Sequence, residues 1–215
     1  MIVSIDGPAA SGKSTTAKLL AKKLSFIHLN TGLFYRAVTY IFIKNNLIDQ
    51  SNLAIDKFFD EHSLKLRGEN FHQVFWNDKN ITKYLKDENI NQFINSISNN
   101  AHIRKYLVEM QRDFTIGKNI VCEGRDIGTV VFPNADYKFY LIADLKSRVN
   151  RRFNEIKNNN VDISRYDIKN NLINRDNNDI NRLVSPLIKA KDAIEVDTTS
   201  MSINEQVDCI YKKIK

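Results

Sequence analysis

The chain has 215 residues, of which 42% are hydrophobic and 27% charged, as is typical of a soluble globular protein of one domain with room for an inserted part. The net charge of +7 suits either a nucleic-acid surface or a site that holds several phosphate groups, and the scattered basic residues favour the second interpretation. No apolar run has the length of a membrane span, and Ile2–Ile5 is too short for a secretory signal. The two cysteines, Cys122 and Cys209, suggest no disulfide framework, so we expect a cytoplasmic protein.

The first 24 residues predict a strand, a glycine-rich turn and a helix. Ile2–Ile5 is a short apolar run, and Thr15–Leu24 carries apolar residues near helical spacing. Between them stands G-x-x-x-x-G-K-S, the pattern of a phosphate-binding loop in its required context. The pattern would occur by chance in roughly one chain in a hundred. Its place between a strand and a helix favours a phosphate-binding function over a chance match. We expect the loop residues to bind a polyphosphate: Gly7, Pro8, Ala9, Ala10, Ser11, Gly12, Lys13, Ser14 and Thr15.

Each fixed position of this loop has a chemical reason. Gly7 and Gly12 let backbone N–H groups close around a polyphosphate with no Cβ in the way. The N-terminus of the following helix adds partial positive charge, and Lys13 can reach the terminal phosphates as a point charge. The Ser14 hydroxyl suits Mg²⁺, which prefers oxygen ligands and keeps several waters. We therefore expect Mg²⁺ at Ser14 together with the nucleotide phosphates.

A second strand and helix are predicted next. Phe26–Leu29 has the composition of a short strand, and Leu33–Asn45 carries apolar residues on one helical side. Arg36 lies in the first turns of that helix, near a strand end, where it could hold a second phosphate bidentately. An ordinary exposed helical arginine is the alternative.

The middle of the chain predicts a small antiparallel sheet. Ser63–Arg67 and Phe71–Trp76 are β-prone runs joined by a hairpin turn at Gly68–Asn70. Asn77–Asn80 predicts another turn, leading into an extended Ile-Thr pair. Because parallel α/β sheets rarely contain such a piece, we interpret residues from about 56 to 90 as an insertion.

A charged segment follows a third buried strand. Residues 89–115 predict helix, and Asn119–Cys122 predicts a strand that leads into Glu123–Thr129. Open α/β sheets bind ligands at the carboxyl ends of parallel strands, so Arg125 and Asp126 are candidate ligand-binding residues. A surface Arg–Asp turn is the alternative.

The last third of the chain predicts two strands and three helical segments. The strands are Tyr137–Ile142 and Ala193–Thr198, and the first and last helices are Lys146–Lys157 and Ile203–Ile214. A flexible break at residues 158–160 precedes a polar helix that runs through residue 175.

Three charged residues at the end of this polar helix have helical spacing. Arg175, Asp179 and Arg182 fall at positions i, i+4 and i+7, which places them on one helical face. Such a face is usually a solvated strip of ion pairs. Here an arginine-rich segment precedes it in a chain that carries a phosphate-binding loop, which favours a ligand role.

Taken together, these stretches resemble the bacterial cytidylate kinases over nearly the whole chain. The phosphate loop alone would not separate this family from other nucleotide kinases. The family-like stretches are Ile5-Asp6-Gly7-Pro8, Thr31-Gly32-x-x-Tyr35-Arg36, the run from Glu123 to Pro133, Arg175-Asp176-x-x-Asp179-x-x-Arg182-x-x-x-Pro186-Leu187 and Ala193-Ile194-x-x-Asp197-Thr198-Thr199.

The resemblance implies an α/β fold: a P-loop NTPase-type parallel sheet flanked by helices, with a small antiparallel β insertion and a short helical lid. It implies a single domain over residues 1–215. The core would comprise residues 1–55, 90–147 and 183–215, the insertion about 56–90, and the lid about 148–182.

The resemblance also implies transfer of a phosphoryl group from ATP to CMP, with dCMP accepted as well, and Mg²⁺ as cofactor. The nine loop residues would bind ATP, and the catalytic residues would be Lys13, Arg125 and Arg182. Arg36 and Arg125 would hold the CMP phosphate, Arg175 and Asp179 the ribose, and Arg104 and Asp126 the cytosine. The expected CMP-binding residues are Thr31, Arg36, Arg104, Arg125, Asp126, Arg175, Asp179 and Arg182.

The chain departs from the family pattern at a few positions. Asn30 stands where the family usually has Asp, and Asn178 replaces an arginine seen in some members. The position of a base-contacting serine is open among Asn95, Ser96 and Ser98.

The expected partners are ATP and CMP or dCMP, with no nucleic acid and no membrane, and the chain is expected to act as a monomer. Alternatives are another small-molecule or nucleoside monophosphate kinase with the same loop, a nucleotide-dependent switch, or a basic RNA-binding protein with an incidental loop. The hairpin insertion and the run from Glu123 to Pro133 argue against another kinase, and no guanine-reading stretch supports a switch.

Overall fold

The structure, a computed structural model, describes residues 1–48, 50–68, 71–157 and 163–214. The chain separates into two compact units. One consists of Met1–Phe26 and Asn119–Lys215, and the other is Ile27–Lys118. We call them the first and the second unit.

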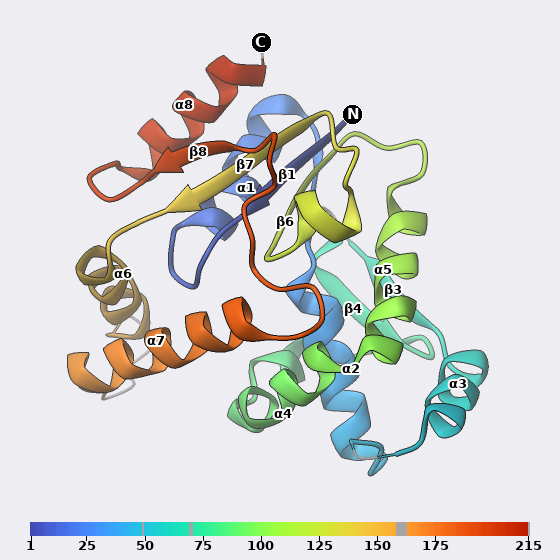
Figure 1. Ribbon diagram of the computed structural model, residues 1–215. Helices are drawn as coiled ribbons and strands as arrows, with labels where there is room; N and C mark the ends of the chain where they lie inside the picture. Colours follow the sequence, from blue (N-terminus) through green and yellow to red (C-terminus); the bar gives the residue numbers. More distant parts are fainter. Residues whose placement is uncertain (49, 69–70, 158–162, 215) are drawn as a thin grey trace. The chain divides into compact units, whose positions relative to one another are not determined.

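The main sheet contains the strands β1 (Ile2–Asp6), β6 (Ile120–Gly124), β7 (Tyr137–Ile142) and β8 (Ile194–Asp197) of the first unit. These four run parallel in the order β6-β1-β7-β8 (Figure 1). With β2 (Ile27–Asn30), the sheet has five strands in the order β2-β6-β1-β7-β8. Strands β1 and β6 are buried on both faces, and such strands are nearly continuous apolar runs, which explains why they were predictable. The predicted parallel α/β sheet is confirmed.

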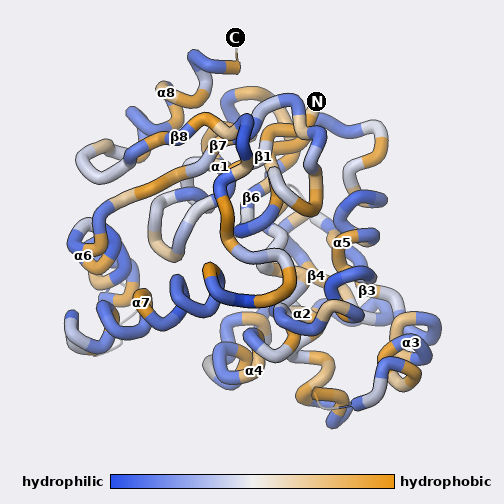
Figure 2. The backbone as a smooth tube through the Cα atoms, in the orientation of Figure 1, coloured by the Kyte–Doolittle hydropathy of each residue, from blue (hydrophilic) through white to orange (hydrophobic). Residues whose placement is uncertain are grey.

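Helices α1 (Lys13–Leu24) and α8 (Ile203–Ile214) of the first unit pack against this sheet. Val3 and Ile5 of β1, Phe139 of β7 and Leu20 and Ile210 of the flanking helices form one buried cluster, each at most 1% exposed. Figure 2 shows β7 as a mainly hydrophobic segment, whereas α7 (Arg165–Asn181) is mainly hydrophilic along its length. The helical elements of this unit are α1 (Lys13–Leu24), η3 (Ile127–Val131), α6 (Leu145–Lys157), α7 (Arg165–Asn181) and α8 (Ile203–Ile214).

The second unit contains a small antiparallel sheet among helices. Strands β3 (Leu64–Arg67), β4 (Gln73–Trp76) and β5 (Lys79–Asn80) pair in that order, which confirms the predicted antiparallel piece. Its core includes Phe42, whose ring meets that of Phe58 edge-on at 5.1 Å between centroids. The helical elements are α2 (Gly32–Lys44), α3 (Asn52–Glu61), η2 (Thr82–Lys86), α4 (Glu88–Asn99) and α5 (Ala101–Thr115).

Side-chain caps and turns set element ends that periodicity did not predict. The helical region 89–115 is interrupted at Asn100, whose side chain accepts the N–H groups of His102 and Ile103 and so begins α5. The turn predicted at residues 77–80 is shorter, because only Asn77 and Asp78 have positive φ and β5 follows them directly. Helix α3 was not predicted; Ser51 caps it by accepting the N–H of residue 54.

The proposed helical face of three charged residues is wrong at its last member. Helix α7 ends at Asn181, and Arg182 has extended backbone with φ −64° and ψ 140°. Only Arg175 and Asp179 therefore share a helical face. Ser185, with φ 52°, and the proline after it keep the chain from continuing the helix.

Two predicted connections reach outside the described residues: the hairpin turn at residues 68–70, of which residues 69 and 70 are not described, and the whole break at residues 158–160. Within the described residues, none of the helices combines the length and the apolar character that crossing a membrane requires.

Candidate active site

The phosphate-binding loop joins β1 to α1 in a conformation that requires its glycines. Gly7 has φ 152°, and a Cβ there would lie 2.3 Å from the backbone oxygen of Leu141. Gly12 has φ 93° and directly precedes α1. Ala10, with φ 58°, adopts a left-handed conformation that is rare for a residue with a side chain, so surrounding contacts must maintain the loop.

Lys13 lies buried at the start of α1, only 5% exposed, and its Nζ donates to the backbone oxygen of Pro8 at 2.9 Å. Burial lowers the pKa of its ammonium group to about 7, and the charge of Arg125 adds to this effect. Arg175 also lowers that pKa, whereas Glu123 and Asp179 oppose the shift. The ammonium is thus fixed beside the loop backbone and is destabilised until further negative charge approaches, which polyphosphate would supply.

Asp6 links the phosphate loop to the segment that follows β6, and the sequence reasoning assigned it no role. Its two carboxylate oxygens accept the N–H groups of Ile127 and Gly128 at 2.9 and 2.8 Å. Burial raises the pKa of this carboxyl group to about 6, although both hydrogen bonds oppose the shift. The position directly before Gly7 was the only sequence signal for it.

Four of the predicted residues of the first unit form a cluster of alternating charge. Arg125, after β6, donates from Nε to Asp179 Oδ2 of α7 at 2.6 Å. Arg182 Nη2 lies 3.5 Å from Asp126 Oδ1, and its Nη1 lies 3.9 Å from Asp179 Oδ1. The side chains of Arg182 and Asp126 are 4% and 7% exposed. The fold thus brings together charges that lie 54 residues apart, and a phosphate could exchange with the carboxylates for these arginines.

The helices α6 and α7 also hold the phosphate loop through residues that the prediction did not include. Asp176 Oδ1 accepts the N–H of Ala9 at 3.1 Å, Arg148 Nη1 donates to the oxygen of Ala9 at 3.2 Å, and the two side chains form an ion pair. Arg151 Nη1 donates to the oxygen of Ser11 at 3.2 Å, and Thr198 Oγ1 donates to the same oxygen at 3.0 Å. Their only sequence signal was their place among the charged residues of the expected lid and in the last family-like stretch.

Three predicted residues lie in the second unit. Thr31 is buried at the start of α2. Arg36 donates from Nε to the oxygen of Leu85 and from Nη1 to Asn91 Oδ1 at 3.0 Å. These contacts hold the Arg36 guanidinium group in a defined orientation.

Arg104, in α5 of the second unit, is only 3% exposed. It donates to the oxygen of Ser98 at 3.1 Å, and its guanidinium lies 5.2 Å from the centre of the Tyr35 ring. A hydrogen bond and a cation–π contact together restrict the orientation of this side chain.

The residues at the loop fit a magnesium ion that is shared with nucleotide phosphates. Ser14 is exposed in the first turn of α1, so its hydroxyl oxygen is accessible to an ion. Both oxygens of Asp6 are already engaged by backbone N–H groups. In the described part of the chain, no group of three or more His, Cys, Asp or Glu residues could hold a metal ion by itself. The phosphates would therefore supply further oxygen ligands.

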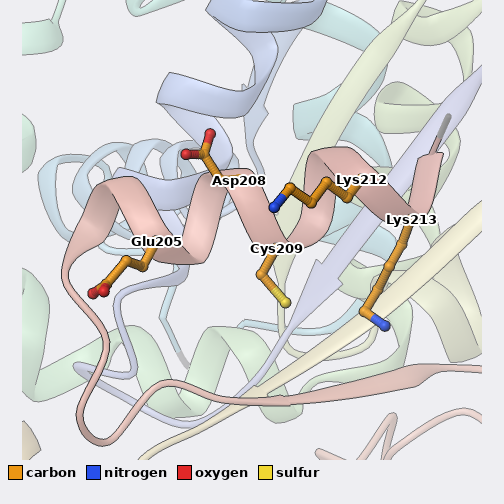
Figure 3. Close-up of a pocket in the computed structure, with 5 residues that line it drawn as sticks. All are labelled: Glu205, Asp208, Cys209, Lys212 and Lys213. Atoms are coloured by element: carbon orange, nitrogen blue, oxygen red, sulfur yellow. The ribbon is translucent and has the colours of Figure 1, made fainter.

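A separate surface pocket lies along α8 and contains none of the predicted site residues. Figure 3 shows its five lining side chains spread along this one helix: Glu205, Asp208, Cys209, Lys212 and Lys213. Asp208 pairs with Lys23 of α1 at 2.5 Å. The charges are mixed and solvated, so this pocket offers no chemistry for the site.

Comparison with known proteins assigns the chain to a family. The family model described as cytidylate kinase matches residues 3–215. A cytidylate kinase of Fusobacterium nucleatum is 40% identical over 215 residues, which cover 100% of this chain and 97% of the relative. One of Listeria welshimeri is 43% identical over 203 residues, covering 94% and 91%.

A comparison of structures supports the fold. The crystal structure of an uncharacterized protein from Eubacterium ventriosum has a TM-score of 0.54 at 13% identity, and the match covers 100% of this chain and 97% of that one. Together with the phosphate loop and the charged cluster, the sequence matches lead to one conclusion: the chain belongs to the cytidylate kinase family.

Proposed function

We propose that the protein transfers the γ-phosphoryl group of ATP to CMP, giving ADP and CDP, and that it accepts dCMP as well. The observation that carries this proposal is the phosphate loop with its buried Lys13, whose pKa responds to the charges of Arg125 and Asp179, in a chain of this family. The loop would bind the phosphates of a nucleoside triphosphate, and the arginines would bind further phosphate groups.

In the proposed reaction an oxygen of the CMP phosphate attacks the γ-phosphorus of ATP in line. A new P–O bond forms while the bond to the β–γ bridging oxygen breaks and ADP leaves. A phosphate monoester is largely anionic near neutral pH, so no strong general base is required. Catalysis then consists of positioning and of neutralising charge.

The catalytic residues are proposed to be Lys13, Arg125 and Arg182. Lys13 would contact the β- and γ-phosphate oxygens, Arg125 the CMP phosphate, and Arg182 the group in transfer. Mg²⁺, bound through Ser14 and the phosphates, would neutralise charge on the β- and γ-oxygens. The pairs of Arg125 with Asp179 and of Arg182 with Asp126 support this proposal, because they hold both guanidinium groups within one cluster.

The remaining CMP-binding residues are proposed from the family resemblance. Asp126 and Arg104 would recognise cytosine, since its N4 amino group donates and its N3 and O2 atoms accept. Asp179 and Arg175 would bind the ribose, freed for that role when the phosphate takes over Arg125. Thr31 and Arg36 would complete the binding of the acceptor nucleotide.

A coupled assay of ADP release with a panel of nucleoside monophosphates tests the function. We expect turnover with CMP and dCMP, weaker turnover with UMP, and none with shikimate or RNA. Lys13→Ala should lose nearly all turnover while its circular dichroism spectrum stays that of the wild type. No ADP release with CMP, or release that depends on another acceptor, would overturn the assignment. We further propose a cytoplasmic monomer, which sedimentation equilibrium and cell fractionation would test.

A further inference from the structure

One peptide group of the phosphate loop is held from both of its ends by charged side chains. The group joins Pro8 to Ala9. Its oxygen accepts from Lys13 Nζ at 2.9 Å, and its N–H donates to Asp176 Oδ1 at 3.1 Å. Because the C=O and N–H bonds of a trans peptide point in opposite directions, Lys13 and Asp176 lie on opposite sides of this one group.

Hydrogen bonds at the two ends of a peptide group reinforce each other. A carboxylate that accepts the N–H polarises the group and places more negative charge on its oxygen. That oxygen is the partner of the Lys13 ammonium, which burial otherwise disfavours. Asp176 therefore both orients the carbonyl group toward the ammonium and strengthens its attraction for the charge.

Packing alone does not account for charged residues at this place. Ala9 lies in a buried apolar cluster with Val149 of α6 and Leu172 of α7, so both helices already pack against the loop. Asp176 and Arg148 interrupt these apolar surroundings, and their side chains are only 12% and 11% exposed. A buried ion pair of this kind is often no more stabilising than apolar residues of similar volume. The pair instead fixes the orientation of the loop backbone, because Asp176 accepts the N–H of Ala9 and Arg148 donates to the oxygen of Ala9.

The backbone of the loop must be held in a fixed orientation next to Ala9. Ala10, the next residue, has φ 58°, a conformation that the chain maintains only when its surroundings determine it. Arg148 holds the oxygen of Ala9, which belongs to the peptide group that precedes the Ala10 φ angle. The ion pair thus holds two successive peptide groups of the loop.

We propose that Asp176 is a positioning residue for the reaction, which acts on Lys13 through the Pro8–Ala9 peptide group, with Arg148 holding the next peptide group. This proposal rests on the proposed function, in which Lys13 contacts the phosphates of ATP. It assigns α7 a role at the donor nucleotide, in addition to the acceptor role of its residues Arg175 and Asp179.

Two substitutions separate this role from that of a structural ion pair. Asp176→Leu removes the acceptor of the Ala9 N–H, whereas Asp176→Asn retains an acceptor oxygen but loses the charge that pairs with Arg148. The matched control is Asp192→Asn, which breaks the ion pair with buried Lys138, whose other hydrogen bond leads to Pro133 instead of the loop.

Steady-state kinetics with each substrate varied, and calorimetric titration with ATP, measure the effect. We expect Asp176→Leu to raise the KM for ATP and its Kd at least about tenfold, the loss of one charged hydrogen bond, while the KM for CMP stays within about twofold. Asp176→Asn should lose clearly less ATP affinity than Asp176→Leu, because its oxygen still accepts the Ala9 N–H although the charge is gone, and the Asp192→Asn control should be unchanged.

The opposite outcomes overturn the proposal. These are equal loss for both nucleotides, a loss in Asp176→Asn as large as in Asp176→Leu, or unchanged ATP binding in Asp176→Leu. If Asp176→Leu does not fold, Asp176→Ala takes its place with the same expected results, because it also removes the acceptor of the Ala9 N–H. A wild type that binds ATP but makes no CDP would refute the proposed function and leave the titrations to test the positioning role.

Discussion

At the scale of single residues, burial and charge oppose each other at Lys13. The pKa of its ammonium is lowered from 10.5 to about 7, mainly by burial. Between these two values the folded protein binds fewer protons than the unfolded chain, so stability without nucleotide should rise as pH increases through this window. Below pH 7 the buried charge is fully present and its cost is greatest. The charge that would bind phosphate is therefore a source of instability in the free enzyme.

Lys13→Met should accordingly lose turnover and gain stability. At 1.36 kcal/mol per pKa unit, the gain at pH 6 is on the order of a few kcal/mol, and it should shrink as pH rises toward 10.5. Thermal unfolding of both proteins from pH 6 to 10, without nucleotide, measures it. Parallel stability curves over that range would show that the buried ammonium carries no such cost.

Asp126 is the residue on which the choice of base should depend. A carboxylate pairs with the N4 amino group of cytosine and repels the oxygen at the same position in uracil, whereas an asparagine side chain can turn to suit either. Asp126→Asn should lower kcat/KM for CMP by on the order of one to two decades and narrow the CMP-to-UMP ratio.

The contact between Asp126 and Arg182 offers a second explanation for a loss of activity in Asp126→Asn. The same kinetic measurements distinguish the two explanations. If Asp126 only holds Arg182, at 3.5 Å, both substrates should suffer in proportion and the ratio should stay constant. Arg182→Lys is the matched variant, because it disturbs that pair and leaves the carboxylate in place. It should lower turnover of CMP and UMP alike.

At the scale of elements, the turn between β1 and α1 tolerates no side chain at Gly7. A Cβ there would meet the Leu141 oxygen at 2.3 Å, and that atom belongs to the backbone of β7, which cannot move aside. Gly117, with φ 71°, is a matched control because a Cβ there would have no atom within 4 Å. Gly117→Ala thus measures the effect of a side chain at positive φ without a collision.

Gly117→Ala should therefore lower the free energy of unfolding only through backbone strain, by about 1–2 kcal/mol. Gly7→Ala should cost clearly more and should also abolish ATP binding, because the loop must shift. Urea unfolding and calorimetric titration with ATP measure both effects. Equal losses of stability in the two variants would show that a Cβ at position 7 does not collide with the Leu141 oxygen. Retained ATP binding in Gly7→Ala would show that the loop does not need glycine at this position.

At the scale of the whole molecule, the two cysteines report on the packing of the first unit. Cys122 is buried in strand β6, which pairs with β1, and burial raises the pKa of its thiol well above the ordinary value, whereas Cys209 on α8 is partly exposed. Because the thiolate is the reactive form, a thiol reagent should modify Cys209 readily and Cys122 only when the sheet unfolds. Mass spectrometry of the modified protein, with Cys209→Ser as control, tests this. Rapid modification of Cys122 in the native protein would contradict the buried strand.

Local sequence patterns were enough for much of the fold. Strand Tyr137–Ile142 and helix Ile203–Ile214 have the predicted ends, because a continuous apolar run and a 3.6-residue period are properties of neighbouring residues. Where a single side chain decided the end of an element, the pattern failed. Asn100 divides one predicted helical region into two by capping the second helix, and a period cannot reveal a hydrogen bond.

The sequence by itself determined the phosphate loop, the order of the main elements and the family, because spacing within a short motif is set by the chemistry of its ligand. Only the tertiary structure decided which charges meet. Asp6 binds the backbone of Ile127 and Gly128, Arg125 pairs with Asp179, and Asp176 holds Ala9 across 167 residues of sequence. Such pairs depend on the path of the chain between parallel strands, and no local period encodes that path.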